Sequence, residues 1–366
     1  MAQEITLNDI RKQFGDIVAV KDVSVTFEAG DFVSLVGPSG CGKTTTLRMI
    51  AGLETPTAGR IHFDGVELTE TTPQERPISM VFQNTALYPH MTCRENIGYG
   101  LKIHGIPKAE RNDRIEEAAD ILQIPDQLDK MPGELSGGQQ QRVALGQAFV
   151  EQPDVLLLDE PMSDLDAKLK EELRVEIQRL HRKLDATVVY VTHDQNEAMT
   201  MSDRIVLMDD GEVAQYDEPR TLFDRPNSEY VATFIGTPTT NVLEFEVEGQ
   251  TAIHSAATID LPSTLSTYSR LKIGVRPRAL TPGKGTFGLD LTIDVIETMG
   301  HEHAIHATTP DGETSVEFVV DDVDDFAVGQ TVTAGADLSD LLFFDETGAH
   351  LAYGSDLATT QEAGQR

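Results

Sequence analysis

The chain has 366 residues, with 61 acidic against 29 basic side chains and a formal net charge of −32. This length allows two domains with a substantial core, and the charge excludes a nucleic-acid partner because the two polyanions would repel each other. No long apolar run and no signal-peptide pattern occurs, so we expect neither a membrane span nor secretion. Cys41 and Cys93 are the only cysteines, which favours a reducing, cytoplasmic compartment.

The acidic residues are spread over both halves of the chain and do not form one tail. At low ionic strength such a charge opposes the compact state through self-repulsion, and at high ionic strength the screening length shrinks to a few ångströms. We interpret the composition as halophilic, an adaptation to a salt-rich cytoplasm. An ordinary acidic surface is the alternative.

In chain order, the first predicted elements are two short strands, Ile17–Val20 and Val23–Phe27, whose alternation suits an antiparallel sheet. They are followed by a buried strand, Asp31–Val36, and by a helix that starts over Thr45–Ala51. Three further apolar runs are typical of buried parallel strands: Ile78–Phe82, Val155–Leu158 and Val188–Val191.

Helical periodicity marks Glu110–Leu122 and a leucine stripe over Leu165–Leu184, for which Ser163 is a candidate N-cap. Ile205–Val213 carries the Asp-Gly pair of a hairpin turn. Helices and parallel strands that alternate in this way predict an α/β domain.

The patterns predict two domains, an α/β domain over residues 1–236 with a helical subdomain at about 87–150, and a small β domain over 237–366. The second half has short alternating runs between Gly, Pro and Asp residues: Leu243–Val247, Leu271–Val275, Leu291–Val295 and Ser315–Val320. The stretch after Gly354 is polar and small, and we expect it to be disordered.

A phosphate-binding loop stands between the predicted strand and helix. The segment fits the pattern G-x-x-x-x-G-K-[ST] and, with the residue after it, consists of Gly37, Pro38, Ser39, Gly40, Cys41, Gly42, Lys43, Thr44 and Thr45. Its glycines let backbone N–H groups and a helix N-terminus point at one anion. Lys43 can reach the outer phosphates, and Thr44 can offer its hydroxyl to Mg²⁺. The loop predicts a nucleoside triphosphate site.

A second helix start of the same physical design follows later in the chain. A capping serine and two glycines precede a helix in the segment Leu135, Ser136, Gly137, Gly138 and Gln139. Leu-Ser-Gly-Gly-Gln is the signature of ATP-binding cassette (ABC) ATPases, and the chain resembles that family along nearly its whole length. The resemblance implies that two cassettes dimerise head to tail. The phosphate-binding loop of one and the signature of the other would then close on the same ATP.

Two carboxylates end a predicted apolar strand. Asp159 and Glu160 follow Val155–Leu158, at the edge where ligands bind in open α/β sheets. The resemblance implies that Asp159 is a Mg²⁺ ligand and that Glu160 is the catalytic general base, which polarises the attacking water. Two solvated carboxylates at a strand end are the alternative interpretation.

Other positions match residues that contact the nucleotide in the family. Gln83 matches a glutamine whose amide ligates Mg²⁺. The implied metal ligands are therefore Thr44, Gln83 and Asp159. His193 matches the histidine that contacts the γ-phosphate, and Phe14 matches the aromatic residue that stacks on adenine. A loop that crosses the dimer interface in the family is matched by Ser163, Asp164 and Asp166.

Two positions depart from the family pattern. Gln140 stands where the signature helix usually has arginine, and Gln147 stands where sugar-importer relatives generally have arginine. We interpret both as reduced basicity and not as loss of the site, because the lining glycines and Ser136 are present.

The second half resembles the oligonucleotide-binding-type (OB-like) regulatory domain that follows the cassette in carbohydrate importers. The match lies at Gly274–Pro277 and Leu342–Asp345. The implied fold class is an α/β P-loop ABC ATPase domain with a helical subdomain, followed by a small all-β OB-like (TOBE) regulatory domain.

The resemblance implies an ATP-hydrolysing importer subunit that uses ATP and Mg²⁺. Its implied partners are a second ABC subunit, as homodimer or heterodimer, two transmembrane permease subunits and an extracytoplasmic solute-binding protein. The chain would lie at the cytoplasmic face of the cell membrane, bound through the permease.

The solute is inferred from resemblance alone. Three segments look most like the carbohydrate group, which includes glycerol phosphate importers: Arg76–Gln83, Ala86–His90 and Glu197–Met201. A polyamine, sulfate or iron importer is the alternative, followed by a soluble non-transport ABC protein. A P-loop kinase leaves Leu135–Gln139 and Glu160 unexplained.

Overall fold

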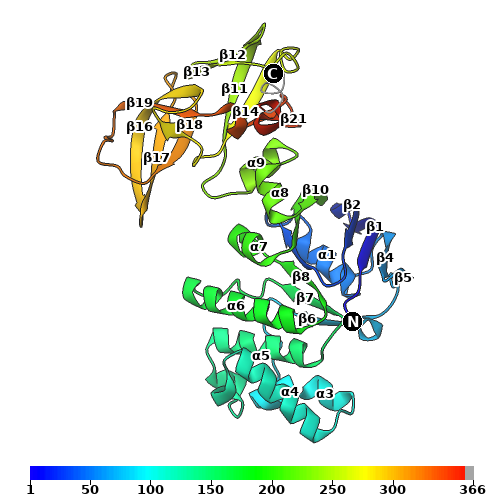
Figure 1. The fold of residues 1–366 in the computed structure, drawn as a ribbon. Helices are drawn as coiled ribbons and strands as arrows, with labels where there is room; N and C mark the ends of the chain where they lie inside the picture. Colours follow the sequence, from blue (N-terminus) through cyan, green and yellow to red (C-terminus); the bar gives the residue numbers. More distant parts are fainter. Residues whose placement is uncertain (359–366) are drawn as a thin grey trace. The chain divides into compact units, whose positions relative to one another are not determined.

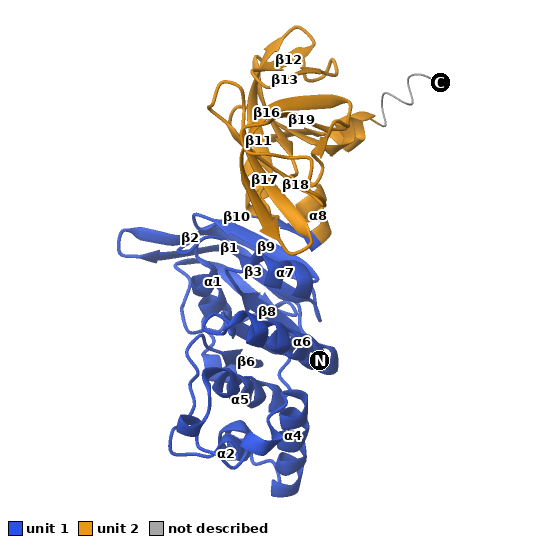
Figure 2. Cartoon of the chain, turned by 90° about the vertical axis from the view of Figure 1, so that its left-hand side faces the viewer, with its two compact units in different colours: residues 1–219 blue, residues 220–366 orange. Residues whose placement is uncertain are grey.

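The computed structural model describes residues 1–358 (Figure 1). The chain divides into two compact units, Met1–Pro219 and Arg220–Arg366 (Figure 2). The sequence predicts a functional boundary after residue 236, and this boundary stays a prediction. Two helices precede it: α8 (Pro219–Asp224) and α9 (Glu229–Phe234).

An antiparallel sheet of strand order β2-β1-β4-β5 opens unit 1. Its strands are β1 (Ile5–Phe14), β2 (Ile17–Phe27), β4 (Ala58–Phe63) and β5 (Val66–Glu67). The two short strands predicted within β2 are one strand. A bulge at Lys21 and Asp22 lies between the pairs Ile10–Val23 and Lys12–Val20. It lets the strand continue where the alternation of apolar and polar residues is interrupted.

The central sheet of unit 1 has the strand order β10-β9-β3-β8-β7-β6, in which β9, β3, β8, β7 and β6 run parallel. Its strands are β3 (Phe32–Val36), β6 (Ile78–Val81), β7 (Val155–Asp159), β8 (Thr187–Val191), β9 (Arg204–Asp209) and β10 (Glu212–Asp217). All residues of β3, β7 and β8 are buried, which confirms these three as buried parallel strands. The predicted strand at Ile78–Phe82 is parallel as expected but only partly buried, because β6 is the edge strand of the sheet. The β9–β10 pair confirms the predicted hairpin.

Some helices of unit 1 pack directly on this sheet, and the others pack on one another. The helices are α1 (Lys43–Ile50), α2 (Cys93–Ile97), α3 (Tyr99–Ile103), α4 (Lys108–Ile121), α5 (Gly137–Val150), α6 (Ala167–Lys183) and α7 (Gln195–Met201). Short 3₁₀ turns lie at Pro73–Glu75, Pro125–Gln127 and Pro132–Glu134. Helices α2 to α5 lie within the predicted helical segment, residues 87–150.

Alternate side chains of the parallel strands enter two different cores. Leu35 and Leu157 pack in one core with residues of α1 and β1. Phe32, Leu156 and Val188 pack in the other core with residues of α5 and α6. Each fully buried aliphatic or aromatic side chain contributes about 1.5–3 kcal/mol, so the two cores fix the strands in register and hold their carboxyl ends at one edge.

The N-cap of α6 is Asp166, and the prediction of Ser163 is wrong. One carboxylate oxygen of Asp166 accepts the backbone N–H groups of Lys168, at 3.1 Å, and Leu169, at 3.0 Å. A carboxylate is favoured there because the N-terminus of a helix carries partial positive charge. Ser163 lies earlier, in a turn where its N–H donates to the Glu160 carbonyl.

A buried ion pair joins α5 to α6. Arg142 contacts a Glu176 carboxylate oxygen at 2.7 Å and also donates to the Leu122 carbonyl at 2.8 Å. Glu172 lies 3.3 Å from the same guanidinium and is about half exposed. The Glu176 side chain is 1% exposed, and this burial raises its pKa to about 7, against the opposing effect of Arg142.

Unit 2 consists mainly of two antiparallel sheets, of orders β13-β12-β11-β14-β20-β21 and β15-β19-β16-β17-β18. The first contains β11 (Asn241–Glu248), β12 (Thr251–His254), β13 (Ala257–Asp260), β14 (Arg270–Val275), β20 (Leu341–Phe344) and β21 (His350–Tyr353). The second contains β15 (Thr281–Pro282), β16 (Phe287–Met299), β17 (Glu302–Thr308), β18 (Ser315–Val320) and β19 (Thr331–Ala336). The predicted alternating runs fall on β11, β14, β16 and β18, and the predicted all-β character is confirmed.

One core lies between the sheets of unit 2, with Phe245, Phe318 and Phe343 among its buried side chains. The sequence predicts disorder after Gly354, but residues 354–358 are helical, and the rest of that stretch lies outside the described residues. Within residues 1–358, no helix is long and apolar enough to cross a membrane.

The raised pKa of Glu176 predicts a component of stability that falls as the pH rises. The native state holds this proton up to about pH 7, whereas the unfolded chain releases it near pH 4.5, so the free energy of unfolding declines between these values. In Glu176→Gln this decline, about 2–3 kcal/mol in total, should be absent from urea unfolding measured at pH 5 and at pH 7.5. The matched control is Glu172→Gln, which should keep the decline. An unchanged pH dependence in Glu176→Gln would contradict the burial effect.

Candidate functional site

The phosphate-binding loop joins β3 to α1 in a conformation that requires glycine at two positions. Gly37 has φ 150°, and a Cβ added there would lie 2.2 Å from the Met208 carbonyl oxygen. Gly42, the N-cap of α1, has φ 99°, and a Cβ would lie 2.5 Å from the Ala19 carbonyl oxygen. The loop is thus packed against neighbouring backbone, and a side chain at either position would displace it.

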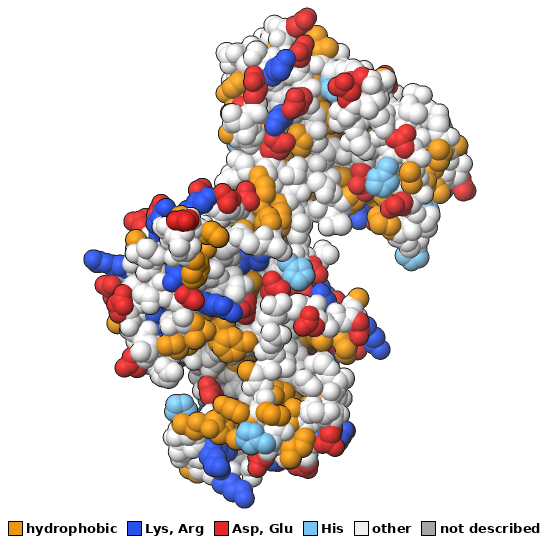
Figure 3. Space-filling model, turned by 180° about the vertical axis from the view of Figure 1, so that it is seen from behind, with side chains coloured by type: hydrophobic (Ala, Val, Ile, Leu, Met, Phe, Trp, Pro, Cys, Tyr) orange, Lys and Arg blue, Asp and Glu red, His pale blue; other side chains and the backbone are white. Residues whose placement is uncertain are grey.

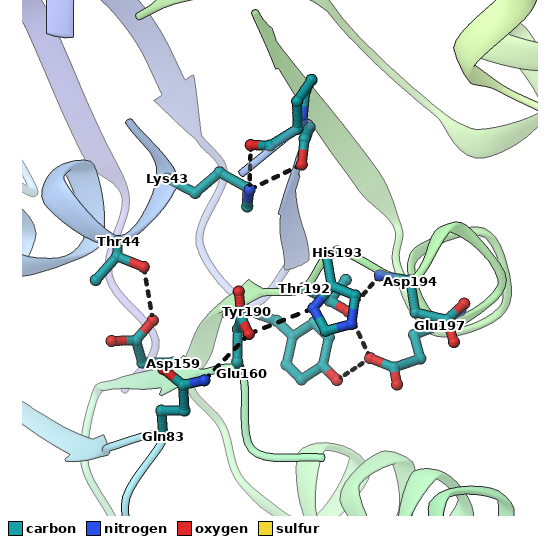
Figure 4. A network of polar contacts seen from close by, with 12 residues as sticks. Lys43, Thr44, Gln83, Asp159, Glu160, Tyr190, Thr192, His193, Asp194 and Glu197 are labelled. Carbon is teal, nitrogen blue, oxygen red and sulfur yellow. Dashed lines mark hydrogen bonds and ion pairs between the residues drawn. The ribbon is translucent and has the colours of Figure 1, made fainter. Parts of the chain in front are cut away.

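The Lys43 ammonium lies inside this loop. It donates to the backbone carbonyls of Gly37, at 2.8 Å, and Pro38, at 2.9 Å, and the residue is 6% exposed (Figure 4). A buried cation among backbone groups at a helix N-terminus gives this place a positive potential. The arrangement suits an anionic ligand.

The end of β7 meets the start of α1 through a hydrogen bond. The Thr44 hydroxyl donates to an Asp159 carboxylate oxygen at 3.1 Å. Asp159 is 4% exposed, and burial raises the pKa of its carboxyl while the Thr44 bond opposes the rise. A hydroxyl and a carboxylate side by side are oxygen ligands of the kind that Mg²⁺ prefers, so the residues present fit that ion.

Glu160 lies next to this pair and contacts residues from two other strand ends. One carboxylate oxygen of Glu160 lies 3.5 Å from the Gln83 amide nitrogen and 3.3 Å from the His193 Nδ1 (Figure 4). The backbone of Glu160 is left-handed, with φ 45°, and its N–H donates to the Val191 carbonyl at 3.1 Å. Such a conformation is costly for a residue with a side chain and is concentrated at functional sites.

A buried network anchors the segment that carries His193. The Glu197 carboxylate, on α7, accepts the Tyr190 hydroxyl at 2.5 Å and the Thr192 hydroxyl at 2.6 Å (Figure 4). The Thr192 hydroxyl in turn accepts the Asp194 N–H at 2.9 Å, and Asp194 is the N-cap of α7. Both chain neighbours of His193 are therefore fixed, which restricts where its ring can lie.

Sequence reasoning missed this network. The sequence places Tyr190 in an apolar strand and Glu197 in a segment that resembles carbohydrate importers, and predicts no contact between the two. The available signal was Asp194 as a helix N-cap, because it places Glu197 in the first turn of α7, next to the end of β8.

The signature segment forms the start of α5. Ser136 is the N-cap: its hydroxyl accepts the Gln139 N–H at 3.4 Å, and the Gln139 side chain accepts the Ser136 N–H at 3.1 Å. Gly138 packs against Leu169, since a Cβ there would lie 3.2 Å from that side chain. Leu135 is buried in the neighbouring core.

Within one chain, the signature lies beside the segments that follow β6 and β7. A cavity of about 160 Å³ is lined by residues that include Gln83, Gly137, Ser163 and Asp164. In the part of the chain that the structure describes, no hydrogen bond or ion pair joins Ser136–Gln139 to Lys43 or Thr44. The structure therefore brings together the loop, Asp159, Glu160, Gln83 and His193, and leaves the signature apart from the phosphate-binding loop.

The remaining sequence-predicted residues are placed as follows. Phe14, at the end of β1, is 46% exposed, and the Lys12 ammonium lies 4.8 Å from its ring centre. Gln140 donates to the Pro132 carbonyl at 3.0 Å, and Gln147 donates to the Asn96 carbonyl at 3.2 Å. The two glutamines that replace arginine thus hold backbone carbonyls around α5.

Two protein-family models match the chain. The model described as "ABC transporter" matches residues 20–163, and the model described as "TOBE domain" matches residues 273–344. The first range contains the phosphate-binding loop, the signature and Glu160. The second covers most of β14 to β20.

Curated relatives match along most of the chain. The sn-glycerol-3-phosphate import ATP-binding protein UgpC 3 of Rhizobium etli is 47% identical over 88% of this chain and 92% of that protein. The xylose/arabinose import ATP-binding protein XacK of Haloferax volcanii is 46% identical over 86% of this chain and 85% of that protein. The maltose/maltodextrin import ATP-binding protein MalK of Yersinia pestis is 42% identical over 90% and 92%.

Solved structures match the first part of the fold. The dimeric structure of MJ0796, a bacterial ABC transporter cassette, is 34% identical with a TM-score of 0.55, over 59% of this chain and 99% of that one. A dimeric post-hydrolysis structure of the same cassette, bound to ADP and Pi, is 33% identical with a TM-score of 0.54, over the same shares of the two chains.

The buried network around Glu197 predicts a large loss of stability on truncation. Glu197→Ala leaves the buried hydroxyls of Tyr190 and Thr192 without their acceptor, so the free energy of unfolding should fall by about 2–4 kcal/mol. The measurement is urea unfolding followed by circular dichroism. The exposed Glu117→Ala, which removes a surface ion pair with Lys183, should cost less than about 1 kcal/mol. Equal stability of the two variants would count against the network.

Proposed function

Since this chain belongs to the ABC transporter family, among the ATP-binding subunits of importers, we propose that it hydrolyses ATP to drive the uptake of a carbohydrate. The relatives named for glycerol 3-phosphate, xylose and arabinose, lactose, and maltose support the carbohydrate class. A polyamine, sulfate or iron remains the alternative solute. A soluble non-transport role is the less favoured alternative, because the relatives named here are import proteins.

The proposal depends above all on one observation, the convergence of four strand ends on Asp159 and Glu160. Lys43 and the loop amides bind the phosphates of ATP, and Phe14 stacks on the adenine. A Mg²⁺ ion held by Thr44, Asp159 and Gln83 would neutralise phosphate charge. The residues Gly37, Pro38, Ser39, Gly40, Cys41, Gly42 and Thr45 complete the phosphate cradle.

Hydrolysis needs a water molecule that is activated beside the γ-phosphate. Glu160 accepts the proton of that water as general base, and its contacts with Gln83 and His193 hold the carboxylate in place. His193 contacts the γ-phosphate and stabilises the charge that develops there. These roles are proposals that follow from the matched positions and from the distances at the site.

Two copies of the chain, or this chain and a second ABC subunit, would close on ATP head to tail. Ser136, Gly137 and Gly138 at the start of α5 would face the triphosphate held by the partner, which fits the absence of a hydrogen bond from them to Lys43 or Thr44 of their own chain within residues 1–358. Leu135 and Gln139 hold the signature in shape, and Ser163, Asp164 and Asp166 would lie at the interface. This arrangement explains two anion-binding helix starts in one cassette.

The subunit would act at the cytoplasmic face of the cell membrane. We propose that it binds two transmembrane permease subunits, which receive the solute from an extracytoplasmic solute-binding protein. The absence of a spanning helix within residues 1–358 is compatible with attachment through the permease. Unit 2 would serve as the regulatory domain.

Hydrolysis should depend on Glu160 and binding on Lys43. Glu160→Gln removes the water-activating carboxylate and keeps the phosphate cradle, so ATPase activity should fall about a hundredfold or more while ATP binding persists. Lys43→Ala should abolish tight binding. Phosphate release and equilibrium binding of a fluorescent ATP analogue measure the two effects.

The matched control is Glu116→Gln, an exposed carboxylate on α4, which should leave both quantities unchanged. Near-normal ATPase activity in Glu160→Gln would remove Glu160 from the proposed role. Tight ATP binding by Lys43→Ala would contradict the assignment of the phosphate site.

We also propose that the protein is adapted to high salt. Figure 3 shows acidic side chains distributed over the drawn face of both units, and the chain carries a net charge of −32. Repulsion within this charge decreases as salt shortens the screening length. This proposal is independent of the ATPase function.

The melting temperature should therefore rise steeply as KCl increases from about 0.1 to 2 M. Differential scanning calorimetry measures it, and a titration with sucrose at equal osmolality controls for solvent exclusion. A melting temperature that stays flat in KCl, or that rises equally in sucrose, would reject the electrostatic explanation.

A further inference from the structure

Unit 1 contains a second concave site, away from the residues assigned to hydrolysis. A cavity of about 410 Å³ is bordered by α2, α3 and the first turns of α4. Its lining includes Arg94, Tyr99, Lys102, Lys108, Arg111 and Asn112. The volume falls within the range of small-molecule sites.

The cations of this cavity are mostly unpaired. Within residues 1–358, Lys102, Lys108 and Arg111 form no ion pair. Arg114, one turn further along α4 and outside the cavity, contacts Glu110 at 2.6 Å. Acidic side chains outnumber basic ones about two to one in this chain, so three cations without carboxylate partners around one cavity depart from the general pattern.

The remaining charged groups of the lining are one carboxylate, Glu95, and one paired cation, Arg94. Glu95, the one lining carboxylate, accepts the N–H of Thr92 at 2.9 Å as part of the capping box of α2. Arg94 lies 3.4 Å from Glu116 and 3.7 Å from Asp129, both of which are largely exposed. The lining thus holds four cations against one carboxylate, in a chain of net charge −32.

We propose that this cavity binds a small phosphorylated metabolite with two phosphate groups. Arginine and lysine together are the side chains that recognise phosphate, and three unpaired cations beside Arg94 can contact two phosphate groups. The N-terminus of α4, which begins at Lys108, adds partial positive charge on the same side. The Tyr99 hydroxyl and the Asn112 amide offer hydrogen bonds to a polar body between the phosphates.

The cavity is connected to the segment that follows Gln83. Tyr99 also lines a neighbouring cavity of about 340 Å³, together with Phe82, Ala86 and Tyr88. The rings of Tyr99 and Tyr88 lie 4.8 Å apart. An anion bound beside Tyr99 would therefore contact a side chain that packs against Tyr88, in the segment between β6 and α2.

The test uses Glu160→Gln chains saturated with ATP and Mg²⁺, so that the phosphate-binding loop is occupied. Glucose 1,6-bisphosphate is titrated by isothermal calorimetry, at the lowest KCl concentration that keeps the folded circular dichroism spectrum. We expect saturable binding with one site per chain. Adding Lys102→Gln and Arg111→Gln should raise the dissociation constant at least about tenfold, because each substitution removes a charge-assisted contact.

Arg182→Gln, an exposed cation in the last turn of α6, is the matched control and should leave the dissociation constant unchanged. Glucose, which lacks phosphate, should not bind. The melting temperature of the double variant checks that its fold is intact. No saturable binding, equal binding of glucose, or binding that the double variant retains would overturn the proposal, and none of these results bears on ATP hydrolysis.

Discussion

The site depends on one constraint, the parallel register of β3, β6, β7 and β8. Leu35 and Asp159 both pair with Val191, so the strands end at one edge of the sheet. Apolar side chains on both faces hold this register, because a shift of one residue would exchange the two cores. The residues that follow each strand are thereby brought close together, although few of them bond to one another. Their arrangement at this edge is a consequence of the apolar side chains buried on the two faces of the sheet.

Polar groups that are buried next to this edge set the position of the side chains to which we assign catalysis. Glu197 fixes the neighbours of His193 through two hydroxyls, and Thr44 fixes Asp159 through one. Each buried carboxylate costs desolvation energy that its hydrogen bonds offset. The same reasoning applies to the pair of Arg142 and Glu176, which joins the signature helix to α6. The segments that carry the site are thus held by buried polar contacts whose loss would destabilise the fold.

The sequence predicted the strand ends well because apolar runs and the polar residues that follow them are local signals. The residues from Gly37 to Thr44, Gln83, Asp159, Glu160 and His193 could all be placed in this way.

Non-local features could not be predicted. The burial of Glu197 requires knowing that α7 folds back on β8, and the bulge in β2 requires knowing its partner strand. Ser163 is a wrong N-cap because the leucine stripe starts at Leu165, before the helix itself begins at Ala167. The cationic cavity combines α2, α3 and α4, which no sequence pattern brings together.

Gln140 and Gln147, which stand where arginine is usual in the family, show that structural contacts in this chain do not require positive charge. Gln140 and Gln147 donate to the carbonyls of Pro132 and Asn96, and a neutral amide performs this task as well as a guanidinium does. Positive charge is therefore not needed for the shape of the signature helix. The phosphate-binding loop likewise attracts its ligand with backbone dipoles and one buried lysine, both of which act at short range. Short-range contacts survive the ionic strength that would screen a basic surface, so an acidic chain can bind a polyanion without a positive net field.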